Sequence, residues 1–475
     1  MNALTAHLPA LQVIVPMLMA PFVVLLRARS LSWAAATATS LLAFAIAIQL
    51  TALVIGGTPL SYQMGSWAAP YGIELQVDAL SALVLLVITG ASSVALIGGR
   101  ESLAAIISEE REPYFFAAWL LALAGMAGIV VSADAFNIFV FMEISSLASY
   151  VLIAGGPDRR ALPATFKYLV MGTIGATFYL IGVGLIYMMT GTLNLADMEL
   201  RVHEVADQKP ILAAAGFITV GLALKAAIFP LHVWLPNAYT YAPHMVTAFL
   251  AACATKVSLY VLLRFDFFVF QQNLVGHDFQ FAAYLMPLAI LGILVGSSVA
   301  MFERNIKRML AFSSVAQIGY IMLGASLVTA TGLTAATLHM FNHALAKGGL
   351  FLAVAAIAVV AAGCRLGDIA GLARRMPGTC AALVLAGRSR IGVPGTAGFI
   401  SKWYLINAVL ELETGGVALV ALILVSSLMA VVYVWRIVET AYFGEPENDE
   451  PAPVPAALVV ILWTVAVANI AFGIA

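Results

Sequence analysis

Seven ionisable side chains stand inside segments that are otherwise almost entirely apolar, and their types are those of a proton relay. They are Glu143, Lys225, Lys256, His339, His343, Lys347 and Lys402. His339, His343 and Lys347 are spaced four residues apart, so on a helix they form one stripe that rises about 12 Å. An ionisable group in the interior of a bilayer costs roughly 3 kcal/mol or more, so it usually faces a partner or a water-filled path.

The chemistry of this set is that of reversible proton binding. A lysine removed from water holds its proton less tightly, and a nearby carboxylate restores the affinity. Glu143 is the one acidic residue in the middle of an apolar segment, so a Glu–Lys pair that forms and separates would act as a switch. Histidine titrates near neutral pH without much help. The set is therefore sufficient for a proton relay.

Other interpretations of these residues stay open at this point. A buried Lys–Glu pair also serves to fix helix packing. His339 and His343 have a spacing compatible with a metal site, but no carboxylate or cysteine lies near them in the sequence, and we expect no metal. His232, between Pro230 and Pro236, is equally compatible with lining the path and with capping a broken helix.

The composition places the chain in a membrane. Hydrophobic residues make up 63% of the 475 positions and charged residues 10%, and the mean hydropathy is +1.01. An ordinary soluble domain is about half apolar and a quarter charged. A net charge of −1 without a basic run excludes nucleic acid as a partner. The three cysteines lack metal-type spacing and are interpreted as packing residues. We therefore predict an all-α integral membrane protein in the lipid bilayer.

A spanning helix needs about 20 mostly apolar residues. That template predicts fourteen spanning segments with short polar links, none long enough for a folded soluble domain. The segments are 8–26, 31–56, 77–98, 114–132, 134–154, 163–190, 211–231, 241–264, 280–302, 307–327, 333–362, 379–408, 415–437 and 453–474. Asp78 and Asp134 stand at helix ends, where they serve as caps or surface charges.

The basic residues predict the orientation. Alternate loops hold 13 of the 23 lysines and arginines, whereas the opposite loops hold only Arg201, Lys209 and Arg264. By the positive-inside rule the first set of loops faces the cytoplasm, so both termini are expected outside. Lys167, near the expected cytoplasmic start of its helix, is interpreted as a residue that reaches the membrane surface.

Two of the lysines stand beside helix breaks. Lys225 is followed by Pro230, Pro236 and Pro243, and Lys402 is preceded by Pro394 between glycines. Broken helices at corresponding places in two parts of a chain indicate the ion site of a transporter. Segments 7 and 12 are therefore predicted to be broken, within two groups formed by segments 4–8 and 9–13. The repeat is inferred from this layout and not from residue identity.

At these residues the chain resembles the antiporter-like family of Mrp-type multisubunit cation/proton antiporters, respiratory complex I and membrane-bound hydrogenases. The motifs are FME at 141–143, ALKAAIFPLHVWLP at 223–236, APHMVTA at 242–248, NIKRMLAFSSVAQIGY at 305–320 and HMFNHALAK at 339–347. The stretches NAYTYAP at 237–243 and GVPGTAGFISKWY at 392–404 look most like the D-type member of the Mrp antiporters. A lysine at position 402 fits D-type members and some complex I subunits.

The resemblance implies fourteen core helices with two inverted five-helix repeats. The expected parts are residues 1–113, a first repeat at 114–264, a second at 265–440, and a final loop and helix at 441–475. By motif position, Glu143 and Lys225 would be the coupling pair and Lys256 the bridge. His339 and His343, with Lys347 on their stripe, would form the central relay, and Lys402 would be the exit lysine.

The function that the resemblance implies is that of a non-enzymatic subunit, without cofactor or metal, in a bacterial inner-membrane hetero-oligomer that exchanges Na⁺ or K⁺ for H⁺. One alternative is a proton-pumping subunit of a redox-driven quinone oxidoreductase or hydrogenase, and another is a membrane scaffold whose charges only lock helices. Arg388 and Arg390 depart from the apolar family pattern just before the second break, and would alter ion access or weaken insertion of the segment.

Overall fold

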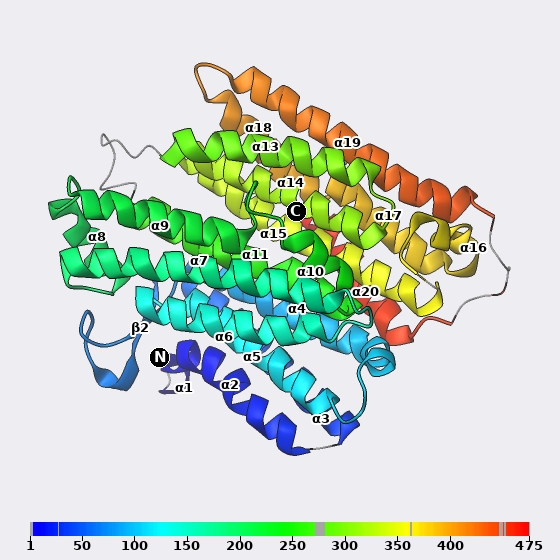
Figure 1. The fold of residues 1–475 in the computed structure, drawn as a ribbon, viewed down its shortest axis with the longest axis horizontal. Helices are drawn as coiled ribbons and strands as arrows, with labels where there is room; N and C mark the ends of the chain where they lie inside the picture. Colours follow the sequence, from blue (N-terminus) through cyan, green and yellow to red (C-terminus); the bar gives the residue numbers. More distant parts are fainter. Residues whose placement is uncertain are drawn as a thin grey trace.

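The computed structural model describes residues 3–26, 28–270, 281–361, 363–445, 450 and 453–474. Within them the chain is almost entirely helical, and long helices lie side by side along the longest axis of the molecule (Figure 1). The described residues contain one small antiparallel sheet, a hairpin of β1 (Leu60–Gln63) and β2 (Glu74–Val77). The predicted all-α membrane fold is confirmed.

Thirteen helices in the described ranges are long and apolar enough to cross a membrane. They are α2 (Leu8–Leu26), α3 (Arg29–Val54), α4 (Ala79–Ile106), α5 (Glu112–Val131), α6 (Ala135–Ala154), α7 (Ala161–Thr190), α9 (Lys209–Ala226), α11 (His244–Arg264, continued by the π-helix η2, Phe265–Phe270), α13 (Phe281–Phe302), α14 (Ile306–Ser326), α15 (Ala330–Val360), α19 (Gly416–Phe443) and α20 (Ala456–Ile474). The remaining predicted segment, 379–408, is the pair α17 (Pro377–Ile391) and α18 (Ala397–Leu410), each too short to span alone.

Short elements occupy the links. They are α1 (Ala3–Ala6), η1 (Met64–Ser66), α8 (Leu195–Glu204), α10 (Leu235–Tyr241), η3 (Leu366–Ile369) and α16 (Leu372–Arg375). The β-hairpin and α8 were not predicted, because their sequences are too polar to match the apolar template. In Figure 1 they lie at the end of the bundle opposite α16 and the loop before it, which carry Arg365, Arg374 and Arg375. We call that second end the basic end.

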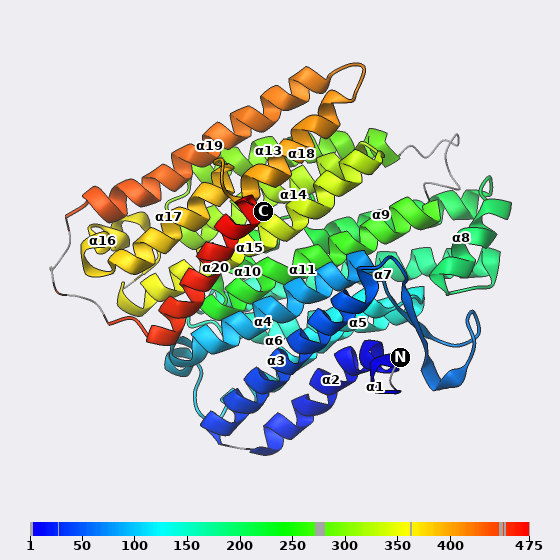
Figure 2. The same cartoon turned by 180° about the vertical axis from the view of Figure 1, so that it is seen from behind.

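Two parts of the bundle meet at its centre. The first half runs from α5 to α11 and the second half from α13 to α19. They meet where α11 of the first half packs on α15 of the second (Figures 1 and 2). The central helices are enclosed by protein. In the membrane-spanning part of α14, 94% of the residues are buried, whereas in that of α19 only 28% are. A helix that is apolar all round and enclosed is a core helix, whereas one exposed to this degree faces lipid. The inverted relation of the two halves and their predicted limits stay predictions.

Both predicted helix breaks are present. α9 ends at Ala226, the next residue, Ala227, has a φ of 56°, and α10 begins only at Leu235. α17 ends at Ile391 and is followed by Gly392 and Gly395, with φ values of 89° and 80°. Left-handed backbone and proline cannot continue a right-handed helix, so each break is encoded locally.

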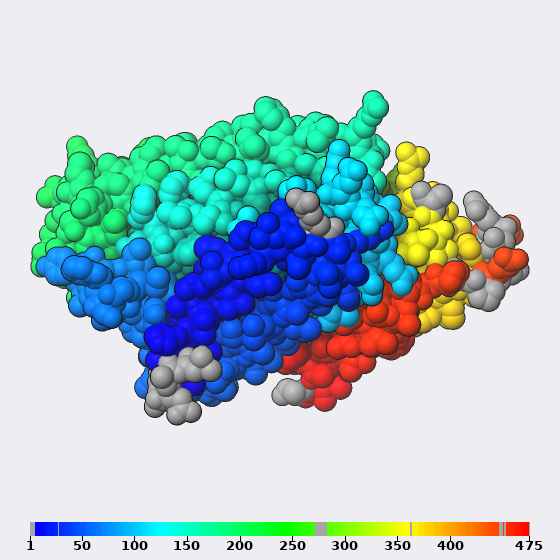
Figure 3. Space-filling view, turned by 90° about the horizontal axis from the view of Figure 1, so that it is seen from below, coloured from blue at the N-terminus to red at the C-terminus, as the bar shows by residue number. Residues whose placement is uncertain are grey.

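Polar side chains fix where the neighbouring helices begin. Asp78 Oδ1 accepts from the Ser81 amide at 2.9 Å at the start of α4, and Asp134 Oδ1 accepts from the Asn137 amide at 2.7 Å at the start of α6. Both acidic residues are therefore helix caps. The C-terminal helix α20, red in Figure 3, lies on the same face as the dark-blue N-terminal helices and packs on α4.

Candidate proton path

The Glu–Lys pair predicted from the sequence is formed in the first half. Lys225, in the last turn of α9, places its Nζ 3.5 Å from Glu143 Oε1 on α6. The same Nζ donates to Ser146 Oγ at 2.7 Å. Glu143 and Ser146 are three residues apart, so they share one face of α6. The Lys225 side chain is 4% exposed and that of Glu143 is 29% exposed, so part of the glutamate side chain reaches the surface of the chain, whereas its Oε1 is buried.

A small cavity connects this pair to the central helix α11. It has a volume of about 20 Å³, which is enough for one water molecule. Lys225 lines it together with four serines, Ser145, Ser146, Ser149 and Ser258. The sequence reasoning missed these serines, although three of them recur at spacings of three and four residues on α6. Hydroxyls of this kind can hold a bridging water beside the lysine.

Lys256 lies on α11 between the two halves. Its side chain is almost fully buried, and its Nζ donates to the Ala251 carbonyl at 2.5 Å. It is near enough to His343 and Lys347 on α15 for their charges to interact. Because α11 packs on α15, Lys256 lies on a helix next to the central stripe, and its role as a bridge stays a prediction.

The α15 stripe faces a complementary stripe on α14. His339 Nε2 lies 3.0 Å from Gln317 Oε1, and the Lys347 Nζ donates to Ser313 Oγ at 2.5 Å and to the Leu310 carbonyl. Ser313 and Gln317 are four residues apart on α14, so one face of that helix presents both acceptors. The sequence reasoning did not single out these α14 residues, and their spacing was the signal that could have found them.

His343 lies at the middle of the stripe. It is 2% exposed, and neither ring nitrogen has a hydrogen-bond partner among the described residues. Buried polar atoms of proteins are nearly always paired with protein or with water. A water molecule at His343 would satisfy the ring and connect it to the flanking His339 and Lys347.

Lys402 is held at the second break. Its Nζ donates to the Ile391 carbonyl at 2.7 Å and to Ser427 Oγ at 2.8 Å. Ile391 is the last residue of α17, so the ammonium lies at the negative end of a helix dipole. The φ of 89° at Gly392 favours glycine, and a Cβ there would lie 2.9 Å from Lys402 Cδ, so a side chain at this position would displace the lysine.

On the far side of the α15 stripe, His339 Nδ1 lies 2.9 Å from Ser401 Oγ, and Ser401 precedes Lys402 on α18. This contact joins the central stripe to the helix that carries the predicted exit lysine. His232 lies in the turn between α9 and α10, where its ring stacks on Phe229 with centroids 5.3 Å apart. Its Nδ1 has no partner in the described part of the chain, and its role stays a prediction.

The described residues contain no group of three or more His, Cys, Asp or Glu side chains that could hold a metal ion. The ring nitrogens of His339 contact Ser401 and Gln317.

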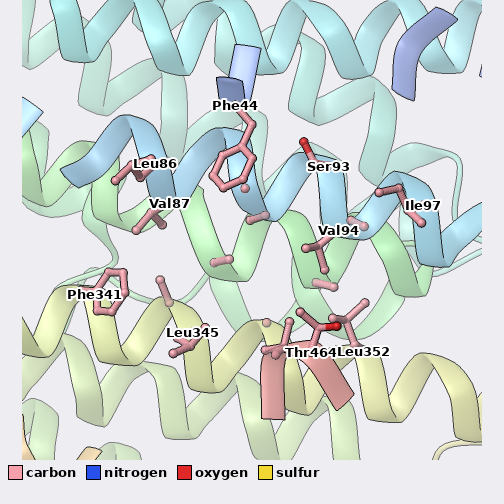
Figure 4. A pocket seen from close by; sticks show the side chains of 18 of the residues that line it. Phe44, Leu86, Val87, Ser93, Val94, Ile97, Phe341, Leu345, Leu352 and Thr464 are labelled. Atoms are coloured by element: carbon pink, nitrogen blue, oxygen red, sulfur yellow. The ribbon is translucent and has the colours of Figure 1, made fainter. Parts of the chain in front are cut away.

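A separate apolar cavity of about 470 Å³ lies between α3, α4, α11, α15 and α20 (Figure 4), and no ionisable residue lines it. Leu86, Phe341 and Leu345 are among its walls, so it suits hydrocarbon and not a proton.

Comparison with known proteins gives consistent relatives. Residues 132–430 match the family described as NADH:quinone oxidoreductase/Mrp antiporter, TM. The N-type subunit of the NADH-quinone oxidoreductase of Desulforudis audaxviator is 42% identical over 95% of this chain and 90% of its own length. The D-type subunit of the Na⁺/H⁺ antiporter of Alkalihalophilus pseudofirmus is 30% identical over 82% of this chain and 77% of its own length.

Solved structures show the same arrangement of helices. A chain of the archaeal membrane-bound sulfane sulfur reductase, a respiratory membrane complex, superimposes with a TM-score of 0.92 at 32% identity, over 98% of this chain and 94% of that one. A chain of the Mrp complex from Dietzia sp. DQ12-45-1b superimposes with a TM-score of 0.89 at 28% identity, over 99% of this chain and 95% of that one.

Proposed function

Because the chain belongs to the NADH:quinone oxidoreductase/Mrp antiporter transmembrane family, we propose that it is the D-type, proton-translocating subunit of a multisubunit Na⁺/H⁺ antiporter. The observation that carries this proposal is the line of buried ionisable groups that runs from the break after α9 to the break after α17. Lysines and histidines at both breaks and between them are what a proton relay across the bundle needs.

The proposed roles follow from the contacts. Glu143 and Lys225 form the switch, because the Lys225 proton is favoured while the carboxylate lies 3.5 Å away and disfavoured when the two separate. The water-sized cavity at Lys225 and the buried Lys256 carry the proton toward α15. His339, His343 and Lys347 pass it along the stripe, and Lys402 releases it. The energy source acts by moving Glu143 and Lys225 together or apart.

The exposure of Glu143 supports partner subunits. The side chain of Glu143 is 29% exposed in the middle of a spanning helix, so in the isolated chain this ionisable residue would border lipid. Such a charge is unfavourable in hydrocarbon, so we infer that another membrane subunit covers this face of α6. The relatives in Mrp and sulfane sulfur reductase complexes are also parts of multisubunit assemblies. We propose the bacterial inner membrane as the location, with the basic end in the cytoplasm and both termini outside.

The energy source has a second candidate. The 42% identity to a quinone oxidoreductase subunit favours a redox-driven complex in which this chain is a non-redox, proton-pumping subunit. The path and its residues are the same in both cases. In the antiporter, inward proton flow drives Na⁺ (or K⁺) outward, and in the redox complex electron transfer elsewhere drives protons outward.

Purification of the tagged chain from its native membrane, with mass spectrometry of the proteins that accompany it, separates the two candidates. We expect several small membrane subunits and no iron–sulfur or flavin protein. Recovery of redox subunits would instead assign the chain to the second candidate.

The proton path itself is tested in vesicles that contain the assembled complex. We expect Lys225→Ala and Lys402→Ala each to abolish driven proton flux, whereas Lys167→Ala, an exposed lysine on α7, should leave it unchanged. If the Lys225→Ala and Lys402→Ala complexes assemble and pump normally, the proposed path is wrong. A loss of assembled complex with normal flux per complex would instead favour the scaffold interpretation.

A further inference from the structure

Arg390, near the end of α17, is a buried cation that the proposed path does not use. It is 3% exposed, and its Nη2 donates to the Ser313 carbonyl. Its Nε and Nη1 make no hydrogen bond of normal geometry among the described residues, and the polar side chain with which the guanidinium interacts is that of Tyr433. Leaving donors of a charged group unpaired in a protein interior is costly, so packing alone gives no reason to place an arginine here.

The groups near Arg390 do not neutralise it. Its charge interacts with five cations or bases of the path on three helices, and with two tyrosines on α14 and α19. They are Lys256, His339, His343, Lys347, Lys402, Tyr320 and Tyr433. Within the described part of the chain, no Asp or Glu forms an ion pair with it. The guanidinium is therefore an uncompensated positive charge among proton carriers.

Its position in the path is defined by two shared contacts. Ser313 accepts from Arg390 through its carbonyl and from Lys347 through its hydroxyl. On the other side, the residue after Arg390, Ile391, accepts from Lys402. Arg390 thus lies between the central stripe and the lysine at the second break.

We propose that Arg390 is an electrostatic barrier that stops cations from moving between Lys347 and Lys402 unless the complex drives them. The inference rests on the proposed proton path and adds a residue that controls leakage along it. Like charges repel strongly where water is scarce, and arginine keeps its proton at any physiological pH. A fixed arginine is one of the devices by which membrane pores exclude protons and other cations.

The neighbouring Arg388 provides a matched control. It lies two residues earlier on the same helix and is exposed, so its side chain points away from the buried path. The two arginines therefore differ in function although both depart from the apolar family pattern. The two residues therefore carry two different predictions.

The test is passive proton leakage through the complete complex in sealed vesicles. A pH gradient is imposed in the absence of Na⁺, of K⁺ and of an electron donor, so that nothing drives the complex. The decay of the gradient is followed with a pH-sensitive dye. We expect Arg390→Leu to raise the leak by about tenfold or more, Arg388→Leu to behave as the parent, and Arg390→Lys to retain most of the barrier. A residue needed only for packing would lower the amount of complex without this pattern.

A second variant identifies the route of the leak. In the Arg390→Leu background, Lys402→Ala should remove the extra leak, because the path then lacks its last carrier. A leak that persists in this double variant, or a leak in Arg390→Leu no greater than in Arg388→Leu at equal amounts of complex, overturns the barrier. Failure of the proposed function is seen separately, as driven proton flux that survives Lys225→Ala.

Discussion

The two halves of the bundle hold their lysines in different ways. In the first half, Lys225 is paired with a carboxylate, Glu143, at 3.5 Å. In the second half, Lys347 and Lys402 donate only to neutral oxygens, and the described residues place no carboxylate in an ion pair with either. The first half thus responds to the separation of two opposite charges. The second half responds to hydrogen-bond acceptors and to the neighbouring cations.

A feature that the halves share makes the difference informative. Lys225 lies in the last turn of α9, and Lys402 donates to the last carbonyl of α17. Both ammonium groups are therefore close to the negative end of a broken helix. Since this feature is common to both, the carboxylate in the first half and Arg390 in the second are what distinguish the surroundings of the two lysines.

The largest expected effect breaks the charge pair. Glu143→Gln and Lys225→Ala should each lower driven proton flux at least about 100-fold, because a positioned group that takes up or releases a proton contributes about 10²–10⁴-fold to a proton-transfer rate. The double variant should be no worse than either single one, since the pair acts as a unit. Flux measured in vesicles against the amount of assembled complex checks this. Additive losses would show that the two residues act independently.

In the second half, the central histidine depends on a neutral acceptor. Gln317→Leu leaves His339 Nε2 without its partner at 3.0 Å, and we expect flux to fall by about tenfold, which corresponds to about 1.4 kcal/mol. Ser326→Ala on the same helix is the control, because Ser326 Oγ donates to the Leu323 carbonyl, which no relay residue contacts. Equal losses in the two variants would contradict a specific role for Gln317.

A smaller effect is expected where Lys402 loses one of its two acceptors. Ser427→Ala removes the 2.8 Å hydrogen bond to Nζ but leaves the Ile391 carbonyl, so flux should fall about three- to tenfold. The adjacent Ser426, whose Oγ bonds to Ser297 Oγ at 2.7 Å, provides the control variant Ser426→Ala. A change confined to Ser426→Ala would place the support of Lys402 elsewhere.

The smallest effect on transport belongs to an ion pair away from the proposed path, between Asp78 at the start of α4 and Arg264 at the end of α11. Burial raises the pKa of the Asp78 carboxyl, but Arg264 and the Ser81 hydrogen bonds outweigh it, so the pKa lies below its usual value. The pair therefore stabilises the fold above the unfolded pKa of about 3.9, and this stabilisation is lost as the pH falls through the lower folded value. Near pH 7, Asp78→Asn should cost about 1–2 kcal/mol of stability.

Thermal unfolding of the purified complex in detergent, compared at pH 7 and in acid, measures that loss. Flux per assembled complex should stay within about twofold of the parent, because this ion pair lies at the ends of its two helices and does not carry protons. A transport defect as large as that of Lys225→Ala would extend the path to the outer end of α4.

The sequence by itself determined the class of fold and identified the ionisable residues inside the apolar segments. In lipid, the backbone N–H and C=O groups of a segment must form hydrogen bonds within the protein, and a helix achieves this by itself. Apolar segments such as 8–26 and 307–327 could therefore be identified directly as spanning helices. The single mid-segment carboxylate, Glu143, had to find a cation, and the spacing of His339, His343 and Lys347 put them on one face. Glycine and proline after Lys225 and before Lys402 located both breaks.

Only the tertiary structure decided which polar partners complete the path. Gln317, Ser313, Ser427 and the serines of α6 are ordinary helix residues until another helix is packed against them. Arg388 and Arg390 are the clearest case, because two residues of helix separate an exposed side chain from a buried one. Helix geometry alone requires that they point in different directions. Which direction is the interior depends on the helices that surround α17, and so on contacts between residues far apart in the chain.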